Sequence, residues 1–504
     1  MRVLGCQRVE VERGVTLGTD VYLPDDPGPW PVVLTRTPYN RWGMQHGARR
    51  FVERGIAWVA QDCRGRYDST GPFTPLVHEA NDGQITLDWI ANQSWCNGRI
   101  GMSGLSYLGI VQVPAAAGGH EALRCIVPGV APGSFFTDWI RYDGCFALAN
   151  AIRWSLTHCS CINQPPCEHF SWSELNALPS LDAIAERAGF MAPHLRDWVA
   201  HDTYDDYWKA VDQNLMHPKV TVPAMHGGGW YDHISRNAFN AYRNIRDHGA
   251  TDAARTGQHL LVAPSGHTNF SAGSDAQQSY GQWQFGPEAA HDYQAYEMQF
   301  LDYYLRDEDN GFTHRPRVKL FIMGDNRWAG FDDYPVPGTT VEPWHLDSAG
   351  SANMATGDGI LSRATPDADR ADAYRYDPAN PTPTYGGAIY WGMPGDYATE
   401  TKGGILGPID PRPGLKRPDM LCYRSAPLES RMVVIGDIEL DLTIASSAED
   451  TDFIAKLCVQ ETDGRIMPIA NGSLRVRYRE SWSQPKALKA DEATPISLHL
   501  GQTA

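Results

Sequence analysis

The hexapeptide Gly104-Leu-Ser-Tyr-Leu-Gly places a serine between glycines at a point where the local pattern changes. The apolar stretch Ile100-Gly-Met precedes it, and a run of small residues, Ile110-Val-Gln-Val-Pro-Ala-Ala-Ala, can continue as a helix after it. A serine at a sharp turn between a strand and a helix is held out of the sheet, with backbone N–H groups beside it. An acyl-transfer nucleophile needs this geometry, so Ser106 is a candidate. Turns of small residues around serine also arise for packing, and the hexapeptide alone leaves both interpretations open.

The acid and the histidine of a triad are expected in loops that follow strands. Asp232 comes after Val220-Thr-Val-Pro-Ala-Met and the run His226-Gly-Gly-Gly, whose glycines we interpret as a turn that presents the acid. His267 follows the apolar strand Leu260-Leu-Val-Ala-Pro. Serine, acid, histidine is one of the known chain orders of a triad. In this interpretation His267 takes the serine proton, and Asp232 orients the imidazole and stabilises its charge.

His226 is the chief rival for the role of the base, because it also lies at the end of a predicted strand. The chain has 17 histidines, and most of them are expected to be surface or structural residues. The order serine, acid, histidine favours His267.

Three cysteines, Cys159, Cys161 and Cys167, lie between His158 and His169. A zinc site would need ligand pairs in a repeated spacing, which this group lacks. We therefore interpret these cysteines as packed thiols, and the sequence predicts neither a metal nor another cofactor. All ten cysteines are spread without paired spacing, which indicates a reducing compartment rather than a disulfide framework.

The elements that position the candidate residues begin with a mixed helix and strand segment. Residues 1–134 alternate β-branched runs such as Trp30-Pro-Val-Val-Leu-Thr-Arg-Thr with amphipathic stretches such as 79–93, a pattern typical of a mainly parallel sheet covered by helices. Residues 135–218 are rich in Trp, His, Asp and Pro and predict an inserted helical cap. Strand signals resume over residues 219–335, so the sheet is expected to continue after the cap.

Helical periodicity disappears over residues 336–504. The stretch Ile438-Glu-Leu-Asp-Leu-Thr-Ile alternates strictly between apolar and polar residues, and Thr462-Asp-Gly and Asn471-Gly predict turns between strands. This segment is predicted to be an all-β domain.

Composition restricts the class of partner. The 504 residues leave room for about three domains of about 150 residues each. Lys and Arg number 43 against 60 Asp and Glu, and the resulting net charge of −17 disfavours nucleic acid and anionic membranes. The sequence shows neither a signal peptide nor a run of about eighteen apolar residues, so we expect a soluble, cytoplasmic protein. The small-molecule substrate that we expect follows from the candidate triad and not from the composition. A homodimer is left open.

Several stretches, in the same order along the chain, resemble the cocaine esterase and X-Pro dipeptidyl-peptidase family of serine hydrolases. They span nearly the whole chain: Arg36-Thr-Pro-Tyr-Asn, Gln61-Asp-Cys-Arg-Gly-Arg-Tyr-Asp-Ser-Thr-Gly, Trp95-Cys-Asn-Gly-Arg-Ile-Gly-Met-Ser-Gly-Leu-Ser-Tyr-Leu-Gly, Gly229-Trp-Tyr-Asp, Gly266-His and Thr451-Asp-Phe-Ile-Ala-Lys-Leu. The serine motif of that family is Ser-Tyr-x-Gly, which accounts for Leu108 at a position where the stricter Gly-x-Ser-x-Gly motif has glycine.

The resemblance implies an α/β-hydrolase fold with an inserted helical cap and a C-terminal all-β jelly-roll domain. It assigns Ser106, Asp232 and His267 as the triad, and gives the oxyanion hole to the Tyr39 hydroxyl and the Tyr107 backbone N–H. The residues alone do not nominate Tyr39. A phenol is nevertheless suited to the role, because it is a donor on a rigid ring that needs little reordering as charge develops.

The resemblance also bears on the substrate. Trp139 and Trp154 fall near positions where the family's acyl pocket has tryptophans, and packing within the cap is an equal alternative. In the α-amino ester hydrolases of this group, carboxylates at the second and third positions after the triad acid hold the substrate ammonium. Here Ile234 and Ser235 stand at those positions. We therefore disfavour aminoacyl substrates and include Ile234 among the substrate-binding residues.

The chain ends at Gln502-Thr-Ala, short of the last jelly-roll strands as the family builds them. This leaves the completeness of the C-terminal domain open.

The sequence thus predicts a metal-independent serine hydrolase that cleaves esters of an apolar or aromatic acid through an acyl-enzyme. An X-Pro peptidase or amidase is the first alternative. It needs an acidic anchor for the substrate's N-terminus, and Glu168 and Glu174 are unplaced candidates. A non-catalytic binding protein on a hydrolase scaffold is the second alternative. Labelling by a fluorophosphonate separates the two classes, because only an activated serine reacts.

Overall fold

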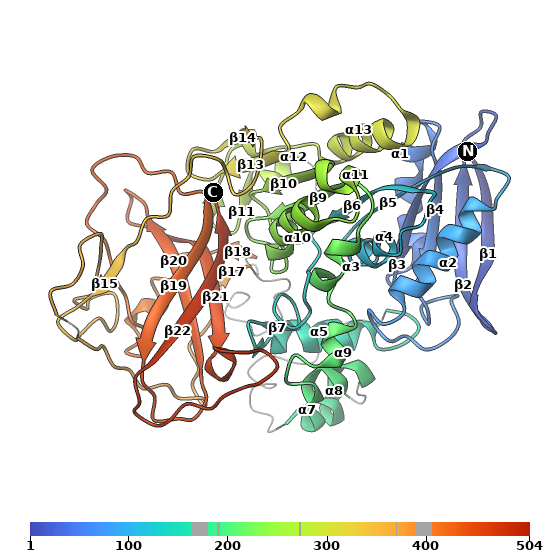
Figure 1. The fold of residues 1–504 in the computed structure, drawn as a ribbon. Coiled ribbons are helices and arrows are strands. Elements are labelled where there is room, and N and C mark those ends of the chain that lie inside the picture. The colour runs from blue at the N-terminus through green and yellow to red at the C-terminus, as the bar shows by residue number, and fades with distance from the viewer. Residues whose placement is uncertain (164–179, 189–191, 272–273, 369, 389–405) are drawn as a thin grey trace.

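The computed structural model describes residues 1–504 except 164–179, 189–191, 272–273, 369 and 389–405 (Figure 1). Its main feature, within the described residues, is a ten-stranded sheet of order β1-β2-β4-β3-β5-β6-β9-β10-β13-β14. The strands are β1 (Arg2–Glu12), β2 (Val15–Leu23), β3 (Trp30–Thr37), β4 (Ala57–Asp62), β5 (Cys96–Leu105), β6 (Leu123–Gly129), β9 (Ala224–Gly229), β10 (Gln258–Ala263), β13 (Val318–Ile322) and β14 (Arg327–Phe331).

From β4 to β13, in sheet order, each adjacent pair of strands is parallel, whereas the pairs β1–β2, β2–β4 and β13–β14 are antiparallel. Every residue of β3, β4, β9 and β10 is buried, as expected for parallel strands covered on both faces. The carboxyl ends of parallel strands meet at one edge of a sheet. The segments that follow β5, β9 and β10 therefore reach the same edge, and they carry Ser106, Asp232 and His267.

Helices cover both faces of the sheet. On one face, α2 and α4 pack on Leu34, Met102 and Ile126. On the other face, α1 and α13 pack on Val33 and Val127. The helices of this part are α1 (Ala48–Val52), α2 (Glu79–Ala91), α3 (Tyr107–Ile110), α4 (Gln112–Ala117), α10 (Arg236–His248), α11 (Asp252–Thr256), α12 (Ser274–Gln277) and α13 (Tyr293–Arg306). No helix within the described ranges is both long enough and apolar enough to cross a membrane.

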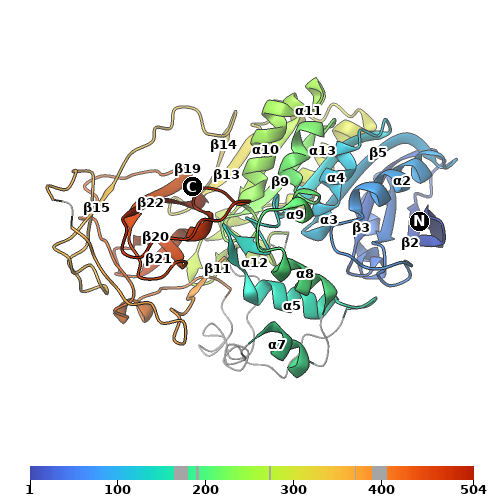
Figure 2. The ribbon, with the colours of Figure 1, turned by 60° about the horizontal axis from the view of Figure 1, so that its bottom comes forward.

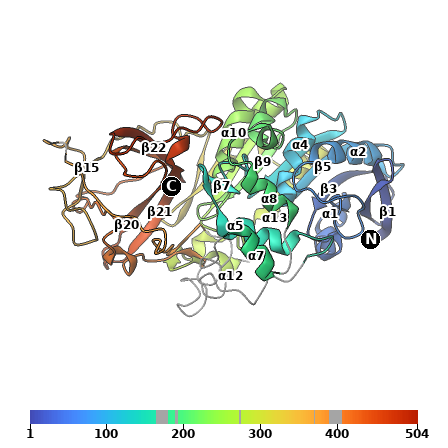
Figure 3. The same ribbon diagram turned by 90° about the horizontal axis from the view of Figure 1, so that it is seen from below.

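A group of short elements is inserted between β6 and β9. It comprises the hairpin of β7 (Arg141–Tyr142) and β8 (Cys145–Phe146) and the helices α5 (Leu148–His158), α7 (Leu181–Ala188), α8 (Pro193–Ala200) and α9 (Asp206–Lys209). Figures 2 and 3 show α5, α7 and α8 together between the C-terminal strands and the N-terminal part of the sheet. This is the helical cap that the sequence predicts.

The C-terminal part consists of antiparallel strand pairs. Its two longest pairs join β19 (Gly436–Ile444) to β22 (Thr494–Thr503) and β20 (Asp452–Gln460) to β21 (Ile466–Arg475). Shorter pairs join β15 (His345–Asp347) to β16 (Ile360–Ser362) and β17 (Gly386–Gly387) to β18 (Gly407–Pro408). The predicted all-β character and the predicted turn at Thr462-Asp-Gly are confirmed.

Two glycine interpretations were wrong. The run of Gly227, Gly228 and Gly229 is not a turn but the second half of β9, and the turn follows it. A Cβ at Gly227 would lie 2.7 Å from the Phe270 ring, and one at Gly229 would lie 2.4 Å from the Ser265 carbonyl oxygen. Asn471-Gly likewise lies inside β21, where a Cβ at Gly472 would lie 2.2 Å from the His499 carbonyl oxygen. These glycines permit close approach of neighbouring chain segments, which sequence cannot distinguish from turn formation.

Candidate active site

Ser106 occupies the sharp turn between β5 and α3. Its backbone has φ 61° and ψ −128°, a conformation that residues other than glycine rarely adopt. The glycines on either side of Ser106 allow the chain to pass close to its neighbours at this turn. A Cβ at Gly104 would lie 2.4 Å from Leu108 Cβ, and one at Gly109 would lie 2.9 Å from the Gly129 carbonyl oxygen. The positions at which a side chain would collide with a neighbouring segment are 104 and 109, so a leucine at position 108 is tolerated.

Asp232 and His267 are hydrogen-bonded to each other. Asp232 Oδ2 lies 2.7 Å from His267 Nδ1, and the Ile234 backbone N–H donates to Asp232 Oδ1 at 2.7 Å. Burial alone raises the pKa of the Asp232 carboxyl. The charge and hydrogen bond of His267, together with His233 and the Ile234 N–H, oppose burial and bring the pKa below its ordinary value. The carboxylate therefore stays ionised and holds the imidazole with Nε2 directed away from it.

Residues on either side of Asp232 are hydrogen-bonded to the C-terminal strands and to the cap. The Tyr231 hydroxyl donates to the Pro468 carbonyl oxygen of β21 at 3.0 Å. Arg236 donates to the His499 carbonyl oxygen of β22 at 3.0 Å and pairs with Asp143, in the β7–β8 turn, at 2.8 Å. The C-terminal strands and the cap thus both fix the position of the acid.

A pocket brings together the serine, the imidazole and the residues that the resemblance assigns to the oxyanion hole and the substrate. It is lined by Tyr39, Ser106, Tyr107, Ile110, Trp139, Trp154, His233, Ile234 and His267. Asp232 is not among these lining residues and is connected to the pocket through its hydrogen bond to His267. Ile110 and His233 were missed from the sequence. His233 is the residue next to the candidate acid, but nothing in its type or spacing distinguished it from the other histidines.

The rival base His226 lies elsewhere. Its Nε2 is 2.8 Å from Gln258 Oε1, and it lines a different cavity, with Gln213 and Asn237. Burial lowers the pKa of His226 to about 4, and the hydrogen bond to Gln258 acts in the opposite direction. His226 is a buried residue of β9 rather than a residue of the pocket that contains Ser106.

Tyr39 is held over the pocket by its loop. Its backbone N–H donates to Thr37 Oγ1 at 3.0 Å, and Arg66 Nε donates to the Pro38 carbonyl oxygen at 2.8 Å. Trp154 Nε1 donates to the Tyr39 hydroxyl oxygen at 3.3 Å. A phenol oxygen that accepts one hydrogen bond can still donate its own proton.

The remaining wall of the pocket is aromatic. Trp139 and Trp154 meet edge to face, with ring centroids 5.3 Å apart, and the Trp154 ring is nearly parallel to that of Tyr107. Both tryptophans are buried, at 6% and 4% exposure. They therefore pack within the cap and also line the pocket, so the two alternatives considered from the sequence are not exclusive.

Four of the residues considered from the sequence, Cys167, Glu168, His169 and Glu174, lie outside the described residues. Among the residues that the structure describes, Asp232, His233 and His267 are the group whose ligand atoms could converge on a metal ion. That group contains the acid and the histidine of the candidate triad.

Comparison with known proteins places the chain in a family. The profile of the X-Pro dipeptidyl-peptidase (S15 family) matches residues 13–269, and that of the X-Pro dipeptidyl-peptidase C-terminal non-catalytic domain matches residues 310–504. A cocaine esterase of Rhodococcus sp. (strain MB1 Bresler) is 33% identical over 98% of this chain and 87% of its own length. A putative serine esterase of Mycobacterium bovis is 27% identical over 95% of this chain and 81% of its own.

A solved structure also matches over the full chain. It is an alpha-amino acid ester hydrolase with a TM-score of 0.81 and 25% identity, and the match covers 100% of this chain and 86% of the other. The fold is thus that of an α/β-hydrolase with a C-terminal all-β domain. The chain belongs to the X-Pro dipeptidyl-peptidase (S15) family and is a serine hydrolase.

Proposed function

We propose that the protein cleaves carboxylic esters through an acyl-enzyme formed on Ser106. The observation that carries this proposal is the hydrogen bond between Asp232 Oδ2 and His267 Nδ1, 2.7 Å long, at the pocket that both His267 and Ser106 line. An imidazole anchored through Nδ1 presents Nε2 as a base. The family and the esterases among its members support the same chemistry.

The proposed reaction has two halves. His267 Nε2 takes the proton from Ser106 Oγ as the oxygen attacks the ester carbonyl carbon. The same proton then goes to the departing alcohol as the carbon–oxygen bond of the ester breaks, and the acyl group stays on the serine. Water repeats the sequence on the acyl-enzyme and releases the acid. In each half the Tyr39 hydroxyl and the Tyr107 N–H donate to the negative oxygen of the tetrahedral intermediate.

The lining of the pocket supports an apolar or aromatic acyl group. Ile110, Trp139, Trp154 and Ile234 supply apolar surface. None of the described lining residues is Asp or Glu, so within the described chain the pocket offers no carboxylate to a substrate ammonium. Burial, and then the nearby His267, lowers the pKa of His233 to about 3 against the opposing effect of Asp232, so this side chain is neutral at pH 7.

Comparing substrates tests this proposal. We expect kcat/KM for an aryl benzoate to exceed that for an X-Pro anilide or an α-amino acid ester by at least about 100-fold, because a substrate ammonium would lose its hydration at a pocket whose described lining residues include no carboxylate. Initial rates with p-nitrophenyl esters and an X-Pro p-nitroanilide provide the measurement. Equal or faster cleavage of the X-Pro anilide would favour the peptidase alternative.

The oxyanion hole gives a second prediction. Tyr39→Phe is expected to lower kcat by about 10² to 10³ with little change in KM, because the phenol bond strengthens only as negative charge develops on the substrate oxygen. Steady-state kinetics with one aryl ester measures both constants. A near-normal kcat would return Tyr39 to a packing role and leave the Tyr107 amide in need of another partner.

A further inference from the structure

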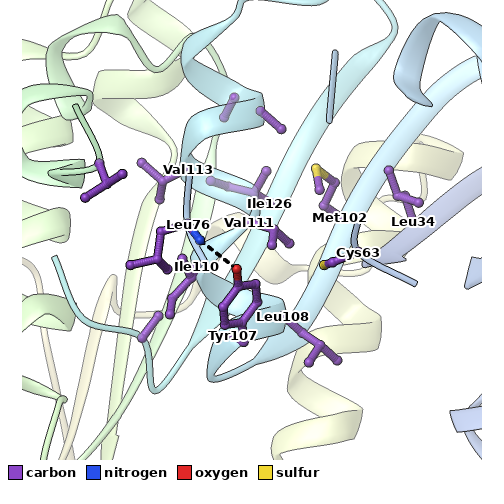
Figure 4. Close-up of a cluster of buried hydrophobic side chains, with 14 of the residues drawn as sticks. Leu34, Cys63, Leu76, Met102, Tyr107, Leu108, Ile110, Val111, Val113 and Ile126 are labelled. Atoms are coloured by element: carbon purple, nitrogen blue, oxygen red, sulfur yellow. Dashed lines mark hydrogen bonds between the residues drawn. The ribbon is translucent and has the colours of Figure 1, made fainter. Parts of the chain in front are cut away.

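Tyr107 lines the pocket, and its phenol hydroxyl is hydrogen-bonded in the core. The side chain is fully buried, and Figure 4 shows it among apolar residues that include Leu34, Leu76 and Met102. Its hydroxyl oxygen accepts from the Leu76 backbone N–H at 2.8 Å and donates to Glu79 Oε1 at 2.8 Å. The residue after the candidate nucleophile is therefore anchored at both ends, by its backbone in the turn and by its hydroxyl in the core.

Leu76 supplies its N–H from a strained backbone. Its φ is 76°, in the left-handed region that a leucine rarely adopts. Such strain persists only where the surrounding structure imposes it, and it concentrates at functional sites. Burial, and then the charge of Glu79, raises the pKa of the Tyr107 phenol well above its ordinary value, so the hydroxyl keeps the proton that it donates.

Glu79 connects the phenol to a buried arginine. Arg36 Nη1 lies 3.0 Å from Glu79 Oε2, and the side chains are 0% and 5% exposed. Arg36 also donates to the Glu79 carbonyl oxygen and to Gln61 Oε1, each at 3.0 Å. Buried ion pairs carry a desolvation cost and contribute little net stability on average, so stability alone does not explain this pair. Arg36 lies near the end of β3, the strand that leads directly into the loop of Tyr39.

The Tyr107 ring also contacts Tyr39, which carries the other proposed oxyanion donor. The Tyr107 and Tyr39 rings pack edge to face with centroids 6.3 Å apart, and Tyr107 is nearly parallel to Trp154, at 6.2 Å. Trp154 in turn donates to the Tyr39 hydroxyl oxygen. Displacement of the Tyr107 side chain would therefore move its own N–H and also the ring against which Tyr39 packs.

We propose that Arg36, Glu79 and the Tyr107 phenol form a buried positioning network that sets the geometry of both oxyanion donors. The inference rests on the proposed oxyanion hole of Tyr39 and the Tyr107 N–H. These three side chains do not touch the reacting atoms and act through the two donors. A donor must lie about 2.7 to 3.1 Å from the developing oxyanion, so a small displacement lowers the rate of the chemical step without weakening ground-state binding.

The test is Tyr107→Phe, with Tyr242→Phe as the matched control. Tyr242 is equally buried, and its hydroxyl donates to Asp333 at 2.9 Å, which in turn pairs with Arg246. This second tyrosine, acid and arginine network lies outside the pocket. Tyr107→Phe is expected to lower kcat by about 10- to 100-fold with KM within about twofold, and Tyr242→Phe to leave both within about twofold. Thermal unfolding of both variants separates this effect from loss of the folded state.

Combining variants sharpens the test. In a Tyr39→Phe background, Tyr107→Phe should cost less kcat than it costs in the wild type, because one of the donors it positions is already gone. If Tyr107→Phe does not fold, Glu79→Gln carries the test, since it keeps an acceptor for the phenol but removes the ion pair with Arg36. It should lower kcat by more than about threefold with KM preserved.

Three outcomes would overturn the inference: a kcat for folded Tyr107→Phe within about twofold of the wild type, an equal loss in Tyr242→Phe, or fully multiplicative losses in the double variant. Failure of the proposed oxyanion hole is distinguishable, because Tyr39→Phe would then retain a normal kcat. An impaired Tyr39→Phe beside a normal Tyr107→Phe would contradict only the positioning network.

Discussion

Replacing Ser106 by alanine is expected to reduce ester hydrolysis by about 10⁵- to 10⁶-fold, since loss of the nucleophile disables the triad as a unit. The fold should survive. Alanine has the same Cβ as serine, and position 106 already accommodates a Cβ at φ 61°. The hydrogen bond from the backbone N–H of residue 106 to the Gly129 carbonyl oxygen, 2.9 Å long, is unaffected. Initial rates and thermal unfolding, measured on the same preparation, provide the test.

Ser103→Ala is the matched control for that variant. Ser103 lies on β5 just before the turn, and its buried hydroxyl donates to Glu297. Its loss should lower the unfolding temperature by a few degrees and leave the activity within about tenfold of the wild type, because the bond is structural. Activity of Ser106→Ala within about tenfold of the wild type would exclude Ser106 as the nucleophile.

His267→Ala is expected to lower kcat/KM by about 10⁴- to 10⁶-fold, and His226→Ala by less than about tenfold. His267 is bound to Asp232 and borders the pocket of Ser106, whereas His226 is bound to Gln258 inside the sheet. The His226 variant should instead lose stability, because it leaves a cavity and an unpaired buried amide. Rates and unfolding curves of the two variants separate these roles, and an inactive His226 variant beside an active His267 variant would reverse the assignment.

The architecture follows from local patterns and family resemblance. The alternation of strand and helix in the first segment predicts the parallel sheet, and the stretch Glu79–Ala91 forms the expected helix α2. The family membership, the α/β-hydrolase fold and the serine hydrolase class are confirmed by the comparisons. The division at residues 134, 218 and 335 and the cytoplasmic location stay predictions.

The errors have one physical origin. Glycine is compatible both with a turn and with a position where another chain segment comes too close for a Cβ, and only the three-dimensional neighbours decide between them. At Gly229 the neighbour is Ser265, on the segment after β10, and at Gly472 it is His499 of β22. Those partners are distant in sequence, so the patterns around each glycine contain no information about them.

The same limit applies to the site. The order of serine, acid and histidine nominates Ser106, Asp232 and His267 because each follows a strand of one parallel sheet. Tyr39 came only from the family resemblance. The bond from the Tyr107 phenol to Glu79, the contact of His233 with the pocket and the bracing of Tyr231 by Pro468 join segments that no local pattern connects.

Reaction of the folded protein with a fluorophosphonate tests the central claim most directly, because only an activated serine forms a stable adduct with it. We predict one adduct, mapped by mass spectrometry to the peptide that contains Ser106, abolished in Ser106→Ala and strongly slowed in His267→Ala. Absence of labelling in the folded wild-type protein would instead indicate a binding protein on a hydrolase scaffold. An adduct on another residue that persists in Ser106→Ala would equally contradict the proposed acyl-enzyme on Ser106.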